Sequence, residues 1–241
     1  MSSGRLVLNT RPRGQAALLT SLLKERAFQV LEFPCVEIVP TLTPDELQAL
    51  VRPLKPSDWI FFTSANAVTI ALQAGSLGNA KVAAIGRKTA AALRDRGGSV
   101  DFVATEANSE ALAAQFLAAV DATGSLTAML LRGRIASSSL PDALAQAGVT
   151  VRSAAIYDSV CPSPAAELLA QVKGRLAEFD SILLTSSEAV RNLERLLGPG
   201  SLVGIRAAVI GAKTAATATA LGMELSVVAP EASIESLVEV L

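Results

Sequence analysis

The chain of 241 residues contains no histidine. This removes the side chain that most often serves as a general acid or base near neutral pH and that most often binds metal ions. There are only two cysteines, Cys35 and Cys161, which is too few for a disulfide framework or a metal-binding cluster. We expect both to be small buried hydrophobic residues. Any chemistry must therefore use other side chains.

Aromatic residues make up only 4% of the chain, and no apolar run reaches the roughly 18 residues of a membrane-spanning helix. The net charge is −1, without a sustained basic stripe, which argues against a nucleic-acid-binding protein. The first residues lead directly into a strand-like run and lack the pattern of a signal peptide. We therefore expect a cytoplasmic protein that binds neither nucleic acid nor membranes, with a core of alanine, leucine and valine.

The sequence repeats itself once, at about half its length. Residues 59–68 (WIFFTSANAV) return as residues 181–190 (SILLTSSEAV), at an offset of 181 − 59 = 122. Residues 82–93 (VAAIGRKTAAAL) return as residues 207–218 (AAVIGAKTAATA), at an offset of 207 − 82 = 125. Small changes in offset are expected when loops change length in a duplicated domain.

The outer parts of the two halves match more weakly. Residues 7–12 (VLNTRP) resemble residues 129–134 (MLLRGR), and we match Arg11 with Arg132 on this basis. Asn108 to Leu112 likewise resembles the segment from residue 232 to residue 237.

Short apolar runs alternate with amphipathic stretches, which is typical of βα units on a parallel sheet. The prediction is an α/β protein with two domains of similar, doubly wound parallel-sheet topology. We expect strands at residues 6–9, 29–33, 59–62, 81–85, 100–103, 127–131, 149–157, 181–184, 206–210 and 224–228. We expect helices at residues 12–26 and 44–51, the second capped by Thr43, and helix-ending glycines at Gly97, Gly148 and Gly222.

Proline-bearing segments at residues 33–44 and 160–164 interrupt this alternation and indicate two crossings between domains. We therefore predict that residues 1–34 plus 162–241 form domain 1, that residues 40–156 form domain 2, and that residues 35–39 and 157–161 are linkers. A simple split near residue 123 is the competing arrangement.

Two Thr-Ser elements, at Thr63–Ser64 and Thr185–Ser186, each follow an apolar strand and open a helix. Their hydroxyls and the unpaired N–H groups of the first helical turn form a candidate site for a carboxylate or phosphate. The alternative is that these residues only cap their helices.

Two Gly-x-Lys-Thr elements follow the next strands, at Gly86 to Thr89 and Gly211 to Thr214. The spacings of the P-loop and of the dinucleotide fingerprint are absent, which excludes nucleoside triphosphates and NAD. Thr89 and Thr214 are expected to face the strand ends and to be better ligand contacts than Lys88 and Lys213.

Arginines follow two strands, at Arg11 and Arg13 and again at Arg132 and Arg134. The carboxyl ends of strands are the edge where open α/β sheets bind ligands, and guanidinium groups there suit carboxylates. Tyr157, the only tyrosine, is placed at a strand end and could donate a proton to a leaving group.

The ordered motifs TSANAV, IGRKTA, LLRG, IYDSV, TSSEAV and IGAKTA resemble the uroporphyrinogen-III synthase family over nearly the whole chain. This resemblance implies two related α/β domains joined by a two-stranded linker, with the first domain assembled from both chain ends. It also implies cyclisation of hydroxymethylbilane, a linear tetrapyrrole with eight carboxylates, with loss of water and inversion of the last pyrrole ring.

By resemblance, Tyr157 matches the family's tyrosine that assists departure of the hydroxyl. The resemblance implies no cofactor and no metal, and it implies that the protein is a monomer. The implied partners are the substrate and, transiently, the preceding enzyme, which hands the substrate over. The implied substrate-binding residues, in a wide cleft between domains, are Arg11, Thr63, Ser64, Asn66, Gly86, Thr89, Arg132, Ser186, Ser187, Gly211, Lys213 and Thr214. Asn66 departs from the basic residue or proline of some members.

Two other functions stay open. One is a non-catalytic two-domain binder that closes on a small anionic ligand. The other is a sugar-phosphate isomerase-like protein, with a phosphate at the Thr-Ser-Ser-Glu element and Glu188 as the base. The matching Thr-Ser element of the other half weakens this idea, because it has Asn66 in place of the glutamate.

Overall fold

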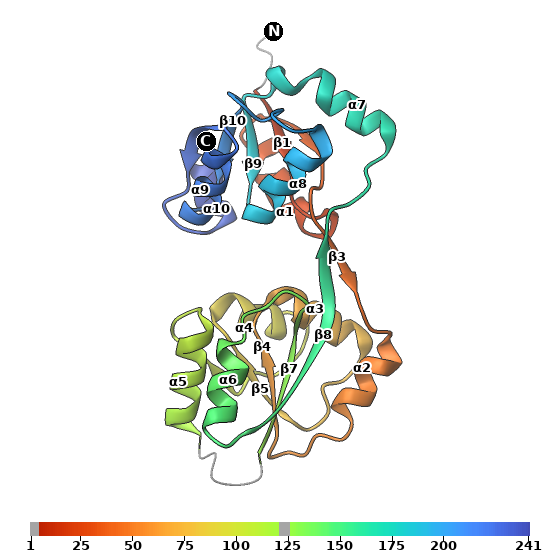
Figure 1. The fold of residues 1–241 in the computed structure, drawn as a ribbon, viewed down its shortest axis with the longest axis vertical. Helices are drawn as coiled ribbons and strands as arrows, with labels where there is room; N and C mark the ends of the chain where they lie inside the picture. The colour runs from red at the N-terminus through yellow and green to blue at the C-terminus, as the bar shows by residue number, and fades with distance from the viewer. Residues whose placement is uncertain (1–4, 121–125) are drawn as a thin grey trace. The chain divides into compact units, whose positions relative to one another are not determined.

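A computed structural model describes residues 5–120 and 126–241 of the protein. The chain divides into two compact units, with residues 1–37 and 160–241 in unit 1 and residues 38–159 in unit 2. The alternative boundary near residue 123 lies outside the described residues. Each unit has a largely parallel sheet with helices between its strands, so the predicted α/β fold class is confirmed (Figure 1).

Unit 1 has a parallel five-stranded sheet in the order β11-β10-β9-β1-β2. The centre of this sheet is apolar on both faces. Val7 and Leu8 are consecutive strand residues that point to opposite faces, and each is 0% exposed. The strands are β1 (Leu6–Asn9), β2 (Gln29–Glu32), β9 (Ser181–Leu184), β10 (Arg206–Val209) and β11 (Glu224–Val228). The helices are η1 (Arg13–Gln15), α1 (Ala16–Glu25), α7 (Ala166–Gly174), η2 (Leu176–Glu178), α8 (Ser187–Leu197), α9 (Ala212–Ala220) and α10 (Ile234–Glu239).

Unit 2 has a six-stranded sheet in the order β3-β8-β7-β4-β5-β6. The strands are β3 (Glu37–Pro40), β4 (Trp59–Phe62), β5 (Lys81–Ala84), β6 (Phe102–Val103), β7 (Thr127–Gly133) and β8 (Thr150–Val160). The helices are α2 (Pro44–Val51), α3 (Ala65–Ala74), α4 (Arg87–Arg94), α5 (Ser109–Ala119) and α6 (Ser139–Gln146).

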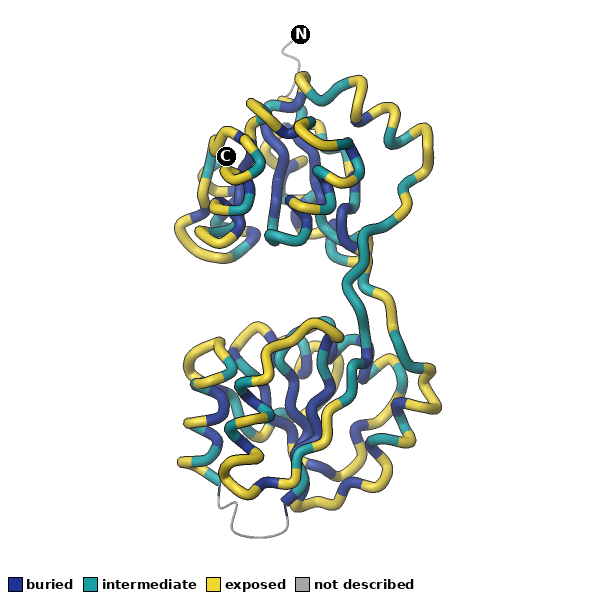
Figure 2. Tube along the Cα trace, in the orientation of Figure 1, coloured by how far each residue is buried: buried dark blue, intermediate teal, exposed yellow. Residues whose placement is uncertain are grey.

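The doubly wound character of unit 2 follows from the alternation along β4. Ile60 and Phe62 pack into one core with residues of α2, α3 and α4, whereas Trp59 and Phe61 pack into a second core with residues of α5 and α6. Successive strand residues point to opposite faces, so a strand that is apolar throughout must be covered on both sides. Figure 2 shows the central strands of each unit as buried.

The two sheets repeat each other strand by strand. Read from its far end and without β3, the unit 2 order is β6-β5-β4-β7-β8, which matches β11-β10-β9-β1-β2 in unit 1. The chain therefore contains a two-strand segment and a three-strand segment, each twice and in alternation. Unit 1 combines the first two-strand segment with the last three-strand segment, and unit 2 combines the two in the middle.

The strand registers correct one detail of the repeat. Taken letter by letter, residues 7–12 and 129–134 align Arg11 with Gly133. In the sheets, however, Val7 is opposite Ser181 and Ala128 is opposite Trp59. The outer segments are thus related by an offset of 128 − 7 = 121, which pairs Arg11 with Arg132 and shifts the comparison by one residue.

Other boundaries also differ from the sequence prediction. Residues 35–39, predicted as linker, include most of β3, which pairs with β8. β8 runs on to Val160 beside this partner, so Tyr157 lies inside a strand rather than at its end. The helix predicted from Pro12 begins with the 3-10 turn η1. The glycines at 97, 148 and 222 do have the positive φ of helix-ending residues.

Two equivalent aspartates, Asp58 and Asp180, fix the amino ends of neighbouring strands. Asp58 is 4% exposed, and its carboxylate accepts from the N–H groups of Lys55 at 2.8 Å and Thr127 at 2.9 Å. Asp180 accepts from the N–H of Leu6 at 2.8 Å in the same manner. Each aspartate therefore joins the start of one segment of the chain to a distant one.

We expect Asp58→Ala to lower the free energy of unfolding by about 2 kcal/mol, because two N–H groups lose a charged acceptor in a buried place. Urea unfolding followed by circular dichroism measures the change. The exposed Asp95→Ala is the matched control and should change stability by less than about 0.5 kcal/mol. Equal effects of the two substitutions would contradict this role of Asp58.

Candidate functional site

In unit 2, the predicted site residues gather where parallel strands end and helices begin. β4, β5 and β7 are parallel, so their carboxyl ends lie at one edge of the sheet. Ser64 caps α3, and its Oγ accepts from the N–H of Ala67 at 3.2 Å. Gly86 opens α4 with extended backbone and no side-chain cap. This edge has first-turn N–H groups suited to anions.

Tyr157 reaches the same edge from β8, which is parallel to β7. Its phenol oxygen lies 3.0 Å from Oγ of Ser64. The ring passes over Gly133, where a Cβ would lie 2.9 Å from Cζ of the tyrosine. A side chain at this position would therefore displace the aromatic ring. Sequence reasoning missed Gly133, although it is the last residue of the LLRG motif.

Unit 1 has an equivalent edge at the ends of β1, β9 and β10. Ser186 caps α8 by accepting from the N–H of Ala189 at 3.1 Å. The hydroxyl of Ser187 donates to the backbone carbonyl of Lys213 at 3.1 Å, which joins the start of α8 to the start of α9. Gly211 opens α9, and nothing lies within 4 Å of the place where a Cβ would stand.

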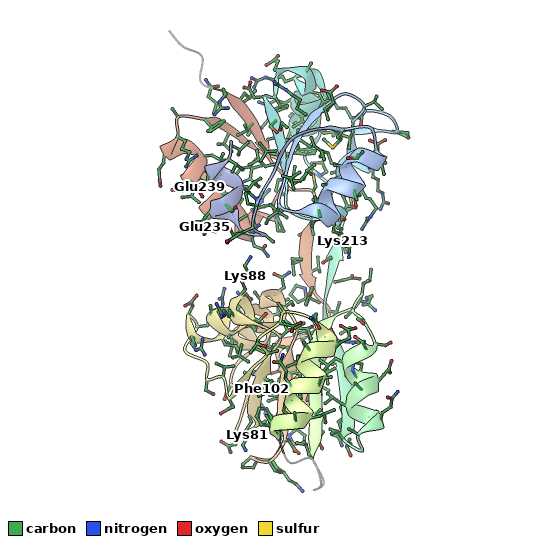
Figure 3. The ribbon with its side chains drawn as sticks, turned by 90° about the vertical axis from the view of Figure 1, so that its left-hand side faces the viewer. Lys81, Lys88, Phe102, Lys213, Glu235 and Glu239 are labelled. Atoms are coloured by element: carbon green, nitrogen blue, oxygen red, sulfur yellow. The ribbon has the colours of Figure 1, made fainter. Side chains whose placement is uncertain are left out.

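The threonines and lysines of the two Gly-x-Lys-Thr elements differ in exposure. Thr89 and Thr214 are each only 5% exposed, so these side chains offer little surface to a ligand. Lys88 and Lys213 are exposed in the first turns of α4 and α9 (Figure 3). The expectation that the threonines make the better contacts is not supported by this burial. The lysine side chains are more accessible to a ligand than the threonine side chains.

The repeated arginines contact the loops that follow them. In unit 1, Nε and Nη2 of Arg11 donate to the carbonyl and the side-chain oxygen of Gln15 at 2.9 and 3.0 Å. In unit 2, Nη1 of Arg132 donates to the carbonyl of Ser137 at 2.7 Å. Burial lowers the pKa of the Arg11 guanidinium, and the charge of Glu235 opposes this shift. Each guanidinium has five N–H donors, so loop contacts and carboxylate binding are compatible.

The remaining predicted residues, Thr63 and Asn66, are partly exposed at the start of α3. Cys35 is fully buried as expected, and burial raises the pKa of its thiol. Cys161 is only partly buried, so the expectation for it is half met. Within residues 5–120 and 126–241, no three acidic or cysteine side chains are grouped as metal ligands. In that same part of the chain, no helix is long and apolar enough to cross a membrane.

Comparison with known proteins decides the family. A family profile described as uroporphyrinogen-III synthase HemD matches residues 17–239. The chain belongs to this family. A uroporphyrinogen-III synthase from Synechococcus elongatus is 29% identical, with 97% of this chain and 93% of that protein covered. One from Chlorobaculum parvum is 27% identical over 93% of this chain and 92% of that protein.

Solved structures of the same family share the fold. Uroporphyrinogen III synthase from Helicobacter pylori matches with a TM-score of 0.63 at 18% identity, over 98% of this chain and 97% of that one. A mutant of the Thermus thermophilus enzyme matches with a TM-score of 0.61 at 21% identity, over 98% and 96%. Membership of this family replaces the two alternatives, an anion-binding protein and an isomerase with Glu188 as base.

The capping role of Ser186 is open to a direct test. Ser186→Ala should lower the free energy of unfolding by about 1 kcal/mol, because the N–H of Ala189 loses its side-chain acceptor. Thermal unfolding measures the change, with Ser186→Asp as the variant that keeps an acceptor and should keep stability. If alanine and aspartate gave the same midpoint as serine, the cap would contribute nothing.

Proposed function

We propose that this uroporphyrinogen-III synthase cyclises hydroxymethylbilane with Tyr157 as the general acid and with the carboxyl edges of both sheets as carboxylate-binding surfaces. One observation carries the proposal: the only phenol of the chain is held at such an edge by Ser64, beside the start of α3. A chain without histidine has few other neutral proton donors.

In this reaction the phenol of Tyr157 gives its proton to the terminal hydroxyl, which leaves as water and produces an azafulvenium cation. The substituted carbon of the far ring then attacks the electrophilic carbon, and the resulting spiro intermediate fragments and recloses with the last ring inverted. The proton released when the final ring regains aromaticity restores the phenol. General acid catalysis of this kind contributes on the order of a hundredfold.

The rest of the rate enhancement comes from holding a flexible substrate in a bent conformation. Carboxylates suit the first-turn N–H groups that follow Ser64, Gly86, Ser186 and Gly211. A site of many separate donors also explains why neither a single basic stripe nor a strongly positive net charge is needed. In this proposal the threonines Thr89 and Thr214 shape the helix starts, and the exposed Lys213 supplies a cation.

The same proposal has the enzyme acting as a cytoplasmic monomer without a cofactor, receiving its substrate from the enzyme that makes it. Elimination of water and ring closure involve no net transfer of electrons, so no redox group is required. Sedimentation with and without substrate tests the monomeric state.

The decisive experiment supplies hydroxymethylbilane and separates the type I and type III products. The proposal expects the type III isomer in excess over the type I isomer that forms without enzyme. Type I product alone would overturn it.

Tyr157→Phe should lower kcat by about ten- to a hundredfold with little change in KM, because the proton donor is lost while the ring is kept. The type III product formed per unit time measures the effect, and circular dichroism controls for folding. Full turnover by this variant would remove Tyr157 from the role of acid.

Gly211→Ala should raise KM several-fold while changing the free energy of unfolding by less than about 1 kcal/mol. The φ of Gly211 is 169° and its Cβ position is open, so alanine fits the fold but narrows the approach of a ligand to the helix start. Gly174→Ala, where a Cβ also meets nothing, is the control and should leave KM unchanged. An unchanged KM for Gly211→Ala would place the substrate elsewhere.

A further inference from the structure

We propose that Ser64 is a positioning residue that turns the proton of the Tyr157 phenol toward the substrate, and that Gly133 is the floor that sets the height of the phenol ring. This inference rests on the function proposed above, and it adds Ser64 and Gly133 as two residues that position the general acid Tyr157. It starts from the distance of 3.0 Å between Oγ of Ser64 and the phenol oxygen, a contact in which either hydroxyl can donate.

The helix cap decides what the serine hydroxyl is free to do. Oγ of Ser64 accepts from the N–H of Ala67 at 3.2 Å, which uses a lone pair and leaves the serine proton without a backbone acceptor in this cap. Donation of that proton to the phenol oxygen leaves the phenol proton available for the leaving hydroxyl. If the phenol donated to Ser64 instead, its proton would point at the serine oxygen and not at the leaving hydroxyl.

The same hydrogen bond strengthens as the reaction proceeds. When Tyr157 loses its proton, its oxygen becomes anionic. A hydrogen bond to an anionic oxygen is stronger than a hydrogen bond to a neutral one. Through Ser64 this oxygen is also tied to the amino end of α3, where the helix dipole favours negative charge. The contact thus stabilises the deprotonated acid more than the resting acid, which is what accelerates a step.

Gly133 completes the arrangement from below. It is buried, and a Cβ there would lie 2.9 Å from Cζ and 3.0 Å from both Cε2 and the oxygen of Tyr157. Its φ is not in the left-handed region, so the backbone itself does not require glycine. The register shift of the β7–β8 pair between Arg132 and Gly133 brings the ring over this residue.

The internal repeat separates capping from positioning. Ser186, the equivalent of Ser64, makes the same cap on α8. At the offset of 121 residues, however, the equivalents of Tyr157 and Gly133 are Val36 (157 − 121) and Pro12 (133 − 121). A capping serine therefore does not need a tyrosine, and the pair in unit 2 is an addition to the cap.

The test is a double-mutant cycle between Ser64 and Tyr157, with the rate of type III product as readout. Ser64→Ala should lower kcat about five- to tenfold and leave KM within about twofold. In the Tyr157→Phe background the same substitution should lower kcat by less than about twofold, because the group that it positions is gone. Losses that multiply, or a raised KM with kcat retained, would overturn the proposal.

Two further variants keep loss of the cap apart from loss of the donor. Ser64→Thr retains a hydroxyl and should keep kcat within about threefold. Thr43→Ala removes the cap of α2, whose side chain accepts from the N–H of Glu46 at 3.3 Å, and should lower the unfolding midpoint without changing kcat. If Ser64→Thr were as slow as Ser64→Ala, or if Thr43→Ala also lowered kcat, a general effect on folding would replace positioning.

Gly133→Ala provides an independent measurement on the ring. It should lower kcat about tenfold or more with KM little changed, since the added methyl group displaces the phenol from Ser64. Unchanged turnover would show that the ring height does not matter. The wild-type enzyme distinguishes the two levels of failure, because absence of type III product there would refute the proposed function, whereas active wild type with an unaffected Ser64→Ala would refute only this inference.

Discussion

Parallel pairing between distant segments is the constraint on which both sheets depend. β1 hydrogen-bonds to β9 although more than half of the chain lies between them, and β4 hydrogen-bonds to β7 across two intervening strands. Because all these strands run in one direction within a sheet, every strand end that starts a helix lies at one edge. The caps, the glycine openings and the arginine-bearing loops of a unit come together for this reason alone. Asp58 and Asp180 secure the opposite edge by holding the first residue of the partner strand.

The sequence was informative wherever local rules and the repeat pointed the same way. The strands at residues 6–9, 59–62, 181–184 and 224–228 have the predicted bounds, since each is a short apolar or β-branched run between clear helix signals. The cap of Thr43 and the three helix-ending glycines also follow from local chemistry. β3 could not be found in this way, because it is short, ends in proline and exists through pairing with β8.

The candidate site was harder to predict, because burial and hydrogen-bond partners are tertiary properties. Thr89 and Thr214 repeat at matched positions, and both are buried in the first turn of a helix. Arg11 and Arg132 each contact the loop after their strand, and such a contact gives the same sequence signal as carboxylate binding. Recurrence therefore pointed to one edge of each sheet but did not distinguish residues that support the fold from residues that would contact a ligand. Gly133 does not recur, and its role is visible only beside the tyrosine ring.

This contrast between repeated and unrepeated residues matches the chemistry. In the proposed mechanism, a substrate with many carboxylates and one leaving hydroxyl is bound by similar edges in both units but receives a proton from only one. The duplicated features are the caps and helix starts, which suit carboxylates. The features that differ between the units are Tyr157 and Gly133, whose equivalents in unit 1 are Val36 and Pro12. Val36 is 6% exposed and belongs to the packed interior, so unit 1 has no group there that could release a proton. In the proposed mechanism, divergence at these two positions gives two similar folds different tasks, with binding shared and proton transfer confined to unit 2.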